Sequence, residues 1–169
     1  MDTGLILRVP EIEPVVGDLR RRLDPNAREG VPAHVTVLYT FRAAEEIDDG
    51  VVARLAEICR RTPAFELTFL RTSRFPGVVW LAPEPRDPID ALTAALVEAF
   101  PDCPPYGGRH RDPEPHLTVA IQPNEARLGR AERTLRRRLA RPVRAHIESC
   151  ALFAHAAGGW REQRRFPLG

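Results

Sequence analysis

The order of apolar and polar positions along the chain predicts short strands that alternate with amphipathic helices. Strand patterns are apolar runs or strict alternations, and helical patterns repeat apolar residues three and four positions apart. In the first half these patterns predict strands at 5–9, 34–39 and 65–71 and helices at 15–23 and 49–60. This half therefore has the order strand, helix, strand, helix, strand.

The second half repeats that order. Strands are predicted at 78–82, 116–121 and 143–154, with helices at 87–100 and 124–139 between them. Pro88 follows Asp87 at a typical helix start, and Asn124 is a typical N-cap residue. A final hairpin is expected through Gly158-Gly159 into a strand at 160–166. An order of elements written twice is typical of an internal duplication.

The repeat predicts an α+β protein made of two similar lobes about a pseudo-two-fold axis. We expect one domain over 1–169, with lobe-forming repeats at about 1–75 and 76–169. A chain of 169 residues is long enough to bury one continuous core. The segment from Pro101 to Pro115 is rich in proline, glycine and charged residues. We therefore expect a loop there, close to the predicted strand at 116–121.

Composition and charge are those of an ordinary globular domain. Hydrophobic residues make up 43% and charged residues 28% of the chain, and the formal net charge is +2. The sequence has neither an apolar run long enough for a membrane span nor a secretory signal pattern, so a cytoplasmic location is expected. We also expect a monomer. All of the basic residues are arginines, which suits phosphate binding but is better explained by a genome-wide compositional bias.

The cysteine and histidine pattern predicts neither a disulfide framework nor a metal site. The three cysteines, Cys59, Cys103 and Cys150, are far apart in sequence, and none belongs to a CxxC pair or a Cys/His cluster of zinc type. We expect them to be reduced and buried as small apolar residues. No cofactor and no metal are predicted.

A His-x-Thr motif occurs in both halves, each time at the start of a predicted strand. His34 precedes Thr36 in HVTVLY, and His116 precedes Thr118 in HLTVAI. Side chains at i and i+2 of a strand share one face, so each strand carries an imidazole and a hydroxyl opposite its apolar side. Polar groups buried there without partners would each cost about 1–3 kcal/mol, so they need water, a partner or a ligand. The matched pair is better explained by a shared site than by two structural histidines.

The two motifs resemble the His-x-Thr-hydrophobic signatures of the 2H phosphoesterase superfamily, which includes bacterial 2′-5′ RNA ligases and 2′,3′-cyclic nucleotide phosphodiesterases. PHLTVA is the closer match, while HVTVLYTF lacks the Phe-x-Gly that often follows in the ligase branch. The resemblance implies a bilobal fold whose antiparallel sheets line a central cleft. It also implies His34 as acid and His116 as base.

Hydrolysis of a cyclic phosphate needs the groups that the motifs supply. A base must activate water and an acid must protonate the departing sugar oxygen, and two imidazoles with pKa values near neutrality can do both. The hydroxyls of Thr36 and Thr118 can donate to the phosphoryl oxygens as these gain charge. The four predicted catalytic residues are therefore His34, Thr36, His116 and Thr118.

Five further residues are candidates for substrate binding. Three are arginines near the motifs that can pair with phosphate, and two are aromatic residues that can stack on a base: Arg42, Arg109, Arg111, Trp80 and Tyr106. An ordinary solvated loop explains the arginines better than a binding role does, and a tryptophan in a strand more often belongs to the core.

The predicted substrate is an RNA end or a small nucleotide that carries a cyclic phosphate. We expect metal-independent hydrolysis by the two histidines. A 2′-5′ RNA ligase with the same catalytic residues remains an alternative, as does a nucleotide- or RNA-binding module without chemistry. The second alternative is disfavoured because both motifs are intact.

Overall fold

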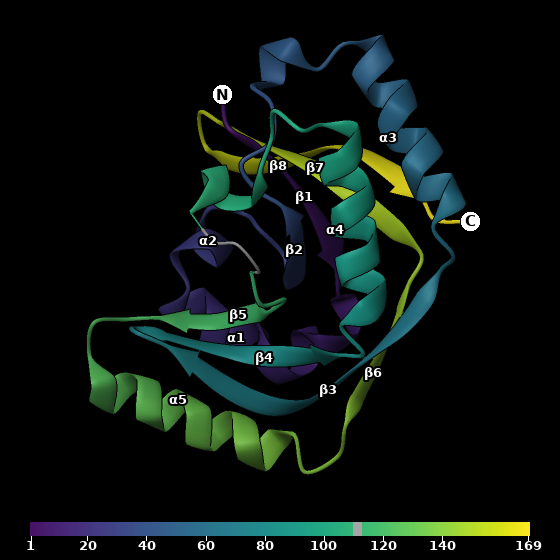
Figure 1. Cartoon of the computed structure of the whole chain (residues 1–169). Coiled ribbons are helices and arrows are strands. Elements are labelled where there is room, and N and C mark those ends of the chain that lie inside the picture. Colours follow the sequence, from purple (N-terminus) through teal and green to yellow (C-terminus); the bar gives the residue numbers. More distant parts are fainter. Residues whose placement is uncertain (110–112) are drawn as a thin grey trace.

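A computed structural model gives the fold for residues 1–109 and 113–169, and within these ranges the strands form two four-stranded antiparallel sheets (Figure 1). The first sheet has the order β2-β1-β7-β8 and the second has the order β5-β4-β3-β6. The strands are β1 (Thr3–Arg8), β2 (His34–Leu38), β3 (Phe65–Phe75), β4 (Val78–Glu84), β5 (Leu117–Ile121), β6 (Val143–Ile147), β7 (Ser149–Ala156) and β8 (Gly159–Pro167).

Four of the described helices begin and end close to the positions that the sequence predicts, and the short helix α2 was not predicted. They are α1 (Glu13–Leu23), α2 (Pro25–Arg28), α3 (Asp49–Arg61), α4 (Asp87–Ala99) and α5 (Glu125–Arg138), and short 3-10 turns lie at Pro10–Ile12, Ala44–Glu46 and Pro105–Gly108. The Asn124 side chain accepts a hydrogen bond from the Arg127 N–H, as expected of an N-cap. Within the described ranges no helix combines the length and apolar character that a membrane span requires.

The last strand of each repeat pairs with the opposite half of the chain. β3 follows α3 in the first half but lies beside β4 in the second sheet, and β7 follows β6 in the second half but lies beside β1. The two sheets are therefore interlocked, and the predicted repeat boundary near residue 75 describes sequence order only.

The predicted single strand over 143–154 is wrong: the chain forms β6 and β7, which belong to different sheets. β6 alternates exposed and buried residues because one of its faces is open to solvent, whereas Cys150–Ala154 in β7 are all buried. The chain crosses from one sheet to the other at Glu148. The change from alternating to continuous apolar residues marks this crossing.

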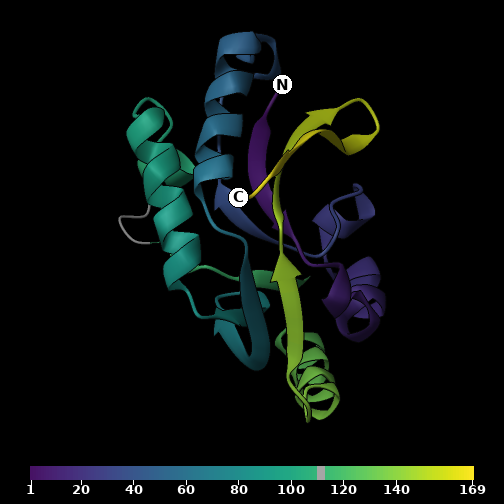
Figure 2. The same ribbon diagram turned by 90° about the vertical axis from the view of Figure 1, so that its right-hand side faces the viewer.

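The helices follow the same pseudo-two-fold relationship as the strands. α1 contacts β5, the histidine strand of the other half, and α4 contacts β2 in the same way. α3 packs on β8 and α5 packs on β3, β4 and β5, so each sheet has one of this second pair of helices against it (Figure 2). A continuous core runs through both halves and includes Leu5, Leu38, Leu81 and Leu117. This is the bilobal α+β architecture that the sequence predicts.

Candidate active site

The two histidine strands carry the same irregularity at the same place. In β2, Thr36 pairs with Ile6 of β1 and Leu38 pairs with Leu5, so Val37 has no partner in the register. In β5, Thr118 pairs with Trp80 of β4 and Ala120 pairs with Val79. Each strand thus has a bulge directly after its threonine. The bulge changes the direction in which the neighbouring side chains point.

The strands bury their apolar side chains and leave the motif residues partly open. Val35 and Val119 are fully buried, while both histidines and both threonines are half-buried. His34, Thr36, His116 and Thr118 all line one cavity of about 330 Å³. The structure therefore brings the four predicted catalytic residues, from two sheets, to one space.

Each imidazole is anchored through the same ring atom. His34 Nδ1 lies 2.8 Å from the carbonyl oxygen of Pro32, and His116 Nδ1 lies 2.7 Å from that of Glu114. A carbonyl oxygen only accepts hydrogen bonds, so Nδ1 carries the hydrogen in both rings. Nε2 is then the nitrogen of each histidine that remains for proton transfer.

Burial lowers the pKa of both histidines. For His34 the pKa falls to about 4, mainly because the ring is desolvated, and the positive charge of Arg20 and interaction with His116 lower it further. Burial also lowers the pKa of His116, although the nearby Glu114 carboxylate and carbonyl oppose the shift. Both imidazoles are therefore neutral at pH 7 in the free protein.

Tyr106 lies in the cavity and is tied to the end of β2. Its backbone N–H donates to the carbonyl oxygen of Tyr39, and its φ of 52° places it in the left-handed region. Burial raises the pKa of the Tyr106 phenol, while a side-chain hydrogen bond with Thr36 opposes that rise. Of the five predicted substrate-binding residues, Tyr106 is the one found among the described cavity-lining residues.

Trp80 lies behind His116 and does not line the cavity. Its ring stacks on Phe75 at 4.8 Å between centroids, and both rings contact the His116 imidazole edge-on, at 5.2 Å for Phe75 and 5.9 Å for Trp80. Trp80 is 5% exposed. These rings pack His116 in place, and Phe75 also forms part of the cavity wall.

The predicted arginine candidates do not line the cavity in the described part of the chain. Arg42 pairs with Asp102 at 2.9 Å and its guanidinium lies 5.3 Å from the centre of the Phe100 ring. Arg109 is exposed. Arg111 lies outside the described residues.

Several cavity residues are not among those that the sequence predicts. Tyr39, Phe153 and Trp160 add aromatic surface, and Asn26 adds an amide. Tyr39 directly follows the first motif strand, which is a signal that sequence reasoning can use. Asn26 and Trp160 reach the cavity only through contacts between distant segments.

The charge of the cavity wall is low. None of the lining residues in the described ranges is an arginine, aspartate or glutamate, and both lining histidines are neutral at pH 7. The described residues also contain no group of three His, Cys, Asp or Glu side chains placed to share a metal ion. The three cysteines are free and buried, as predicted.

A bilobal α+β fold that brings two His-x-Thr strands together at one cavity defines a protein of the two-histidine phosphoesterase class. Residues 9–159 match the 2′-5′ RNA ligase superfamily, and the chain belongs to this family. No curated protein sequence matches the chain.

Solved structures with this fold are similar over nearly their full length. TT0787 of Thermus thermophilus is 20% identical with a TM-score of 0.65, covering 99% of this chain and 98% of that one. E. coli LigT in its apo form is 20% identical with a TM-score of 0.63, covering 99% and 96%. LigT complexed with 3′-AMP is 19% identical with a TM-score of 0.58, covering 99% and 97%.

Proposed function

We propose that this protein hydrolyses 2′,3′-cyclic phosphates of small nucleotides or RNA ends by acid-base catalysis with His34 and His116. One observation carries the proposal. Both imidazoles line one cavity of about 330 Å³, and each has its Nδ1 bound to a carbonyl oxygen, so that each offers Nε2 to a substrate. A pair of imidazoles in this arrangement supplies the base and the acid that a phosphodiester displacement needs.

The proton transfers balance between the two rings. One Nε2 accepts a proton from water as the water oxygen forms a bond to phosphorus. The bond from phosphorus to one ribose oxygen breaks, and that oxygen takes a proton from the other Nε2. The product is a phosphomonoester, and solvent exchange then restores both histidines. The family resemblance assigns the acid to His34 and the base to His116, and the reverse reaction exchanges these roles.

In this proposal the threonines stabilise the charge that develops on phosphorus-bound oxygens. Thr36 and Thr118 line the same cavity from β2 and β5. Their hydroxyls can donate to the two non-bridging oxygens, which gain negative charge in the transition state.

The weakly charged wall supports a singly charged substrate. A cyclic phosphodiester carries one negative charge, which one protonated imidazole can balance. A phosphomonoester or a polyphosphate carries more charge and would leave part of it unpaired in the cavity. Such a wall favours binding the cyclic ester and releasing the product.

Two solved complexes of one similar protein support a nucleotide or phosphate ligand. LigT structures complexed with 3′-AMP and with phosphate share the fold of this chain. The family name also keeps formation of a 2′-5′ linkage as the second candidate, since it needs the same four residues.

A substrate panel tests the proposal. Purified protein is offered 2′,3′-cyclic nucleotides, a 2′-5′-linked dinucleotide and cleaved tRNA halves, and products are separated by chromatography. We expect fastest turnover on a cyclic phosphate, lost in the His34→Ala/His116→Ala double variant. Joining of tRNA halves without hydrolysis of any cyclic nucleotide would favour the ligase, and no reaction on the whole panel would overturn the catalytic proposal.

A further inference from the structure

The part of the cavity wall formed by α2, β1, β7 and β8 contains a half-buried amide with no hydrogen-bond partner. Asn26 of α2 lines the cavity, and its side chain forms no hydrogen bond with any residue in the described ranges. A half-buried amide normally satisfies its two donors and its acceptor. The Asn26 amide is therefore available to a ligand.

An indole ring and an apolar surface lie in the same part of the wall. Trp160 packs against a small cluster formed by Ile6, Val31, Ala151 and Phe153, which is separate from the main core. Its ring also meets Tyr39 edge-on at 6.0 Å between centroids. Trp160 is held in place on this side and still lines the cavity.

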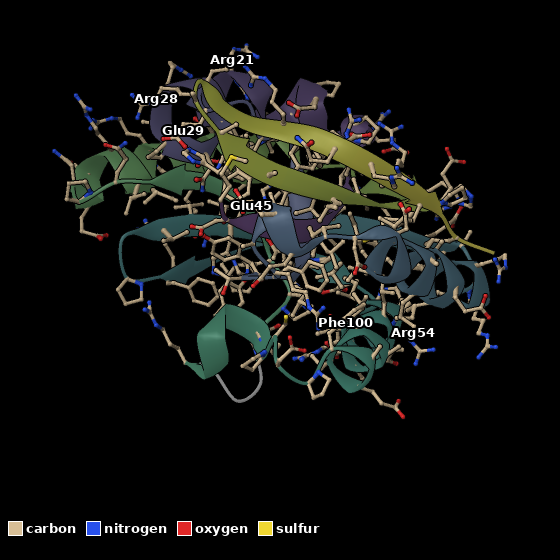
Figure 3. The ribbon with its side chains drawn as sticks, turned by 90° about the horizontal axis from the view of Figure 1, so that it is seen from above. Arg21, Arg28, Glu29, Glu45, Arg54 and Phe100 are labelled. Carbon is tan, nitrogen blue, oxygen red and sulfur yellow. The ribbon has the colours of Figure 1, made fainter. Side chains whose placement is uncertain are left out.

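The backbone links the amide and the indole into one wall. The Trp160 N–H donates to the carbonyl oxygen of Glu29 at 2.7 Å, and the Val31 N–H donates to that of Asn26 at 3.0 Å. A carboxylate oxygen of Glu29 lies 3.4 Å from His155 Nε2. Figure 3 shows Glu29 near the end of the β7–β8 hairpin, where these contacts join α2 to β8.

We propose that this wall is a nucleobase subsite, in which Trp160 stacks on the base and Asn26 pairs with its hydrogen-bonding edge. This inference rests on the proposed function, because it assigns the substrate's base to the cavity that holds the two histidines. An amide presents a donor beside an acceptor. Adenine presents the complementary pair, because its exocyclic amine donates and an adjacent ring nitrogen accepts. The apolar cluster suits an uncharged aromatic ring, and base stacking on such a ring is favourable.

The first test removes the amide. We expect Asn26→Ala to lower kcat/KM for 2′,3′-cyclic AMP roughly tenfold, the effect of a lost hydrogen bond. Hydrolysis of bis(4-nitrophenyl) phosphate, which has no base, should be unchanged in the same variant. Gln163→Ala, which removes an exposed amide outside the cavity, is the matched control and should leave both rates unchanged. An equal loss on both substrates would overturn the subsite.

The second test changes the hydrogen-bonding groups that the side chain at position 26 presents to the base. Asn26→Asp replaces the donor by a second acceptor, and two adjacent acceptors match the two N–H donors on the guanine edge. We expect the ratio of kcat/KM for 2′,3′-cyclic GMP to that for 2′,3′-cyclic AMP to rise by about tenfold relative to the wild type. A ratio that stays constant would show that Asn26 does not contact the base.

A binding measurement separates this inference from the proposed function. Calorimetric titration with 3′-AMP and 3′-GMP should show the same change of preference in Asn26→Asp, and Trp160→Ala should weaken both nucleotides more than Trp160→Phe does. Base-dependent binding without hydrolysis would keep the subsite and overturn the catalytic proposal. Hydrolysis with binding that is indifferent to Asn26 and Trp160 would do the opposite.

Discussion

His34 and His116 are held by equivalent contacts: each points Nδ1 at the carbonyl oxygen of the residue two positions earlier, at 2.8 Å and 2.7 Å. The equivalence extends to the strand bulge after each threonine. Two halves of one chain that preserve the same local geometry each bring a histidine to one cavity. The histidine surroundings nevertheless differ, because aromatic rings contact His116 and the pKa of His34 falls to about 4.

Replacing either histidine is expected to remove a complete proton-transfer step. His34→Ala and His116→Ala should each lower kcat on a cyclic nucleotide roughly a hundredfold or more. The double variant should be little worse than either single variant, because groups that act together are not additive. Steady-state kinetics of the three variants measures this. His146→Ala, which changes an exposed residue of β6, is the control, and near-normal turnover by His116→Ala would contradict the two-histidine mechanism.

The threonines are expected to contribute less than the histidines. Thr36→Val and Thr118→Val each keep the β-branched shape that suits a strand and remove one hydroxyl donor. A loss of roughly tenfold to a hundredfold in kcat should follow, with thermal stability close to that of the wild type. Thr36→Val should also raise the pKa of Tyr106 further, because it removes the hydrogen bond that lowers this pKa. Loss on the scale of the histidine variants would show that the threonines do more than donate a hydrogen bond.

The sequence predicts which face the motif residues occupy because the strand period fixes it. His34 and Thr36 share a face whatever the rest of the chain does, and the repeat shows that His116 and Thr118 are equivalent to them. β3 and β7 each pair with a strand from the opposite half of the chain. This pairing joins distant segments, so local periodicity cannot predict it. For the same reason, the contact between Trp160 and Glu29 could be identified only from the structure. The same holds for the part of the cavity wall that contains Asn26.

Gly159 is expected to be required for the contact between α2 and β8. Its φ is +103°, and a Cβ at this position would lie 2.2 Å from the carbonyl oxygen of Glu29. Gly159→Ala should therefore lower the free energy of unfolding by about 1–3 kcal/mol and weaken 3′-AMP binding. Gly107→Ala is the control, since its φ is +63° with no atom within 4 Å of the added Cβ. Equal destabilisation by both variants, measured by denaturant unfolding, would show that backbone strain alone matters.

Activity is expected to survive removal of divalent metal ions. The proposed proton transfers use imidazole nitrogens, and the described residues offer no three-residue cluster of metal ligands. Hydrolysis of 2′,3′-cyclic AMP with excess EDTA should proceed at the untreated rate. Loss of activity that returns when a divalent ion is added would require a different mechanism.

The dependence of kcat/KM on pH is expected to have an optimum below pH 6.5. The reaction needs one neutral and one protonated imidazole, and this parameter reports the pKa values of the free enzyme. Burial lowers the pKa of both histidines, to about 4 for His34, so at pH 7 both are neutral and few molecules hold the required proton. As the pH falls, the singly protonated form increases until the second imidazole is also protonated, which gives a bell-shaped profile.

A bound phosphodiester anion raises both pKa values, so the optimum of kcat should lie at higher pH than that of kcat/KM. Initial rates from pH 4 to pH 9, at substrate concentrations below and above KM, measure both profiles, with circular dichroism to verify folding at each pH. A kcat/KM optimum above pH 7, or a flat profile, would show that the two buried histidines do not share the acid and base roles.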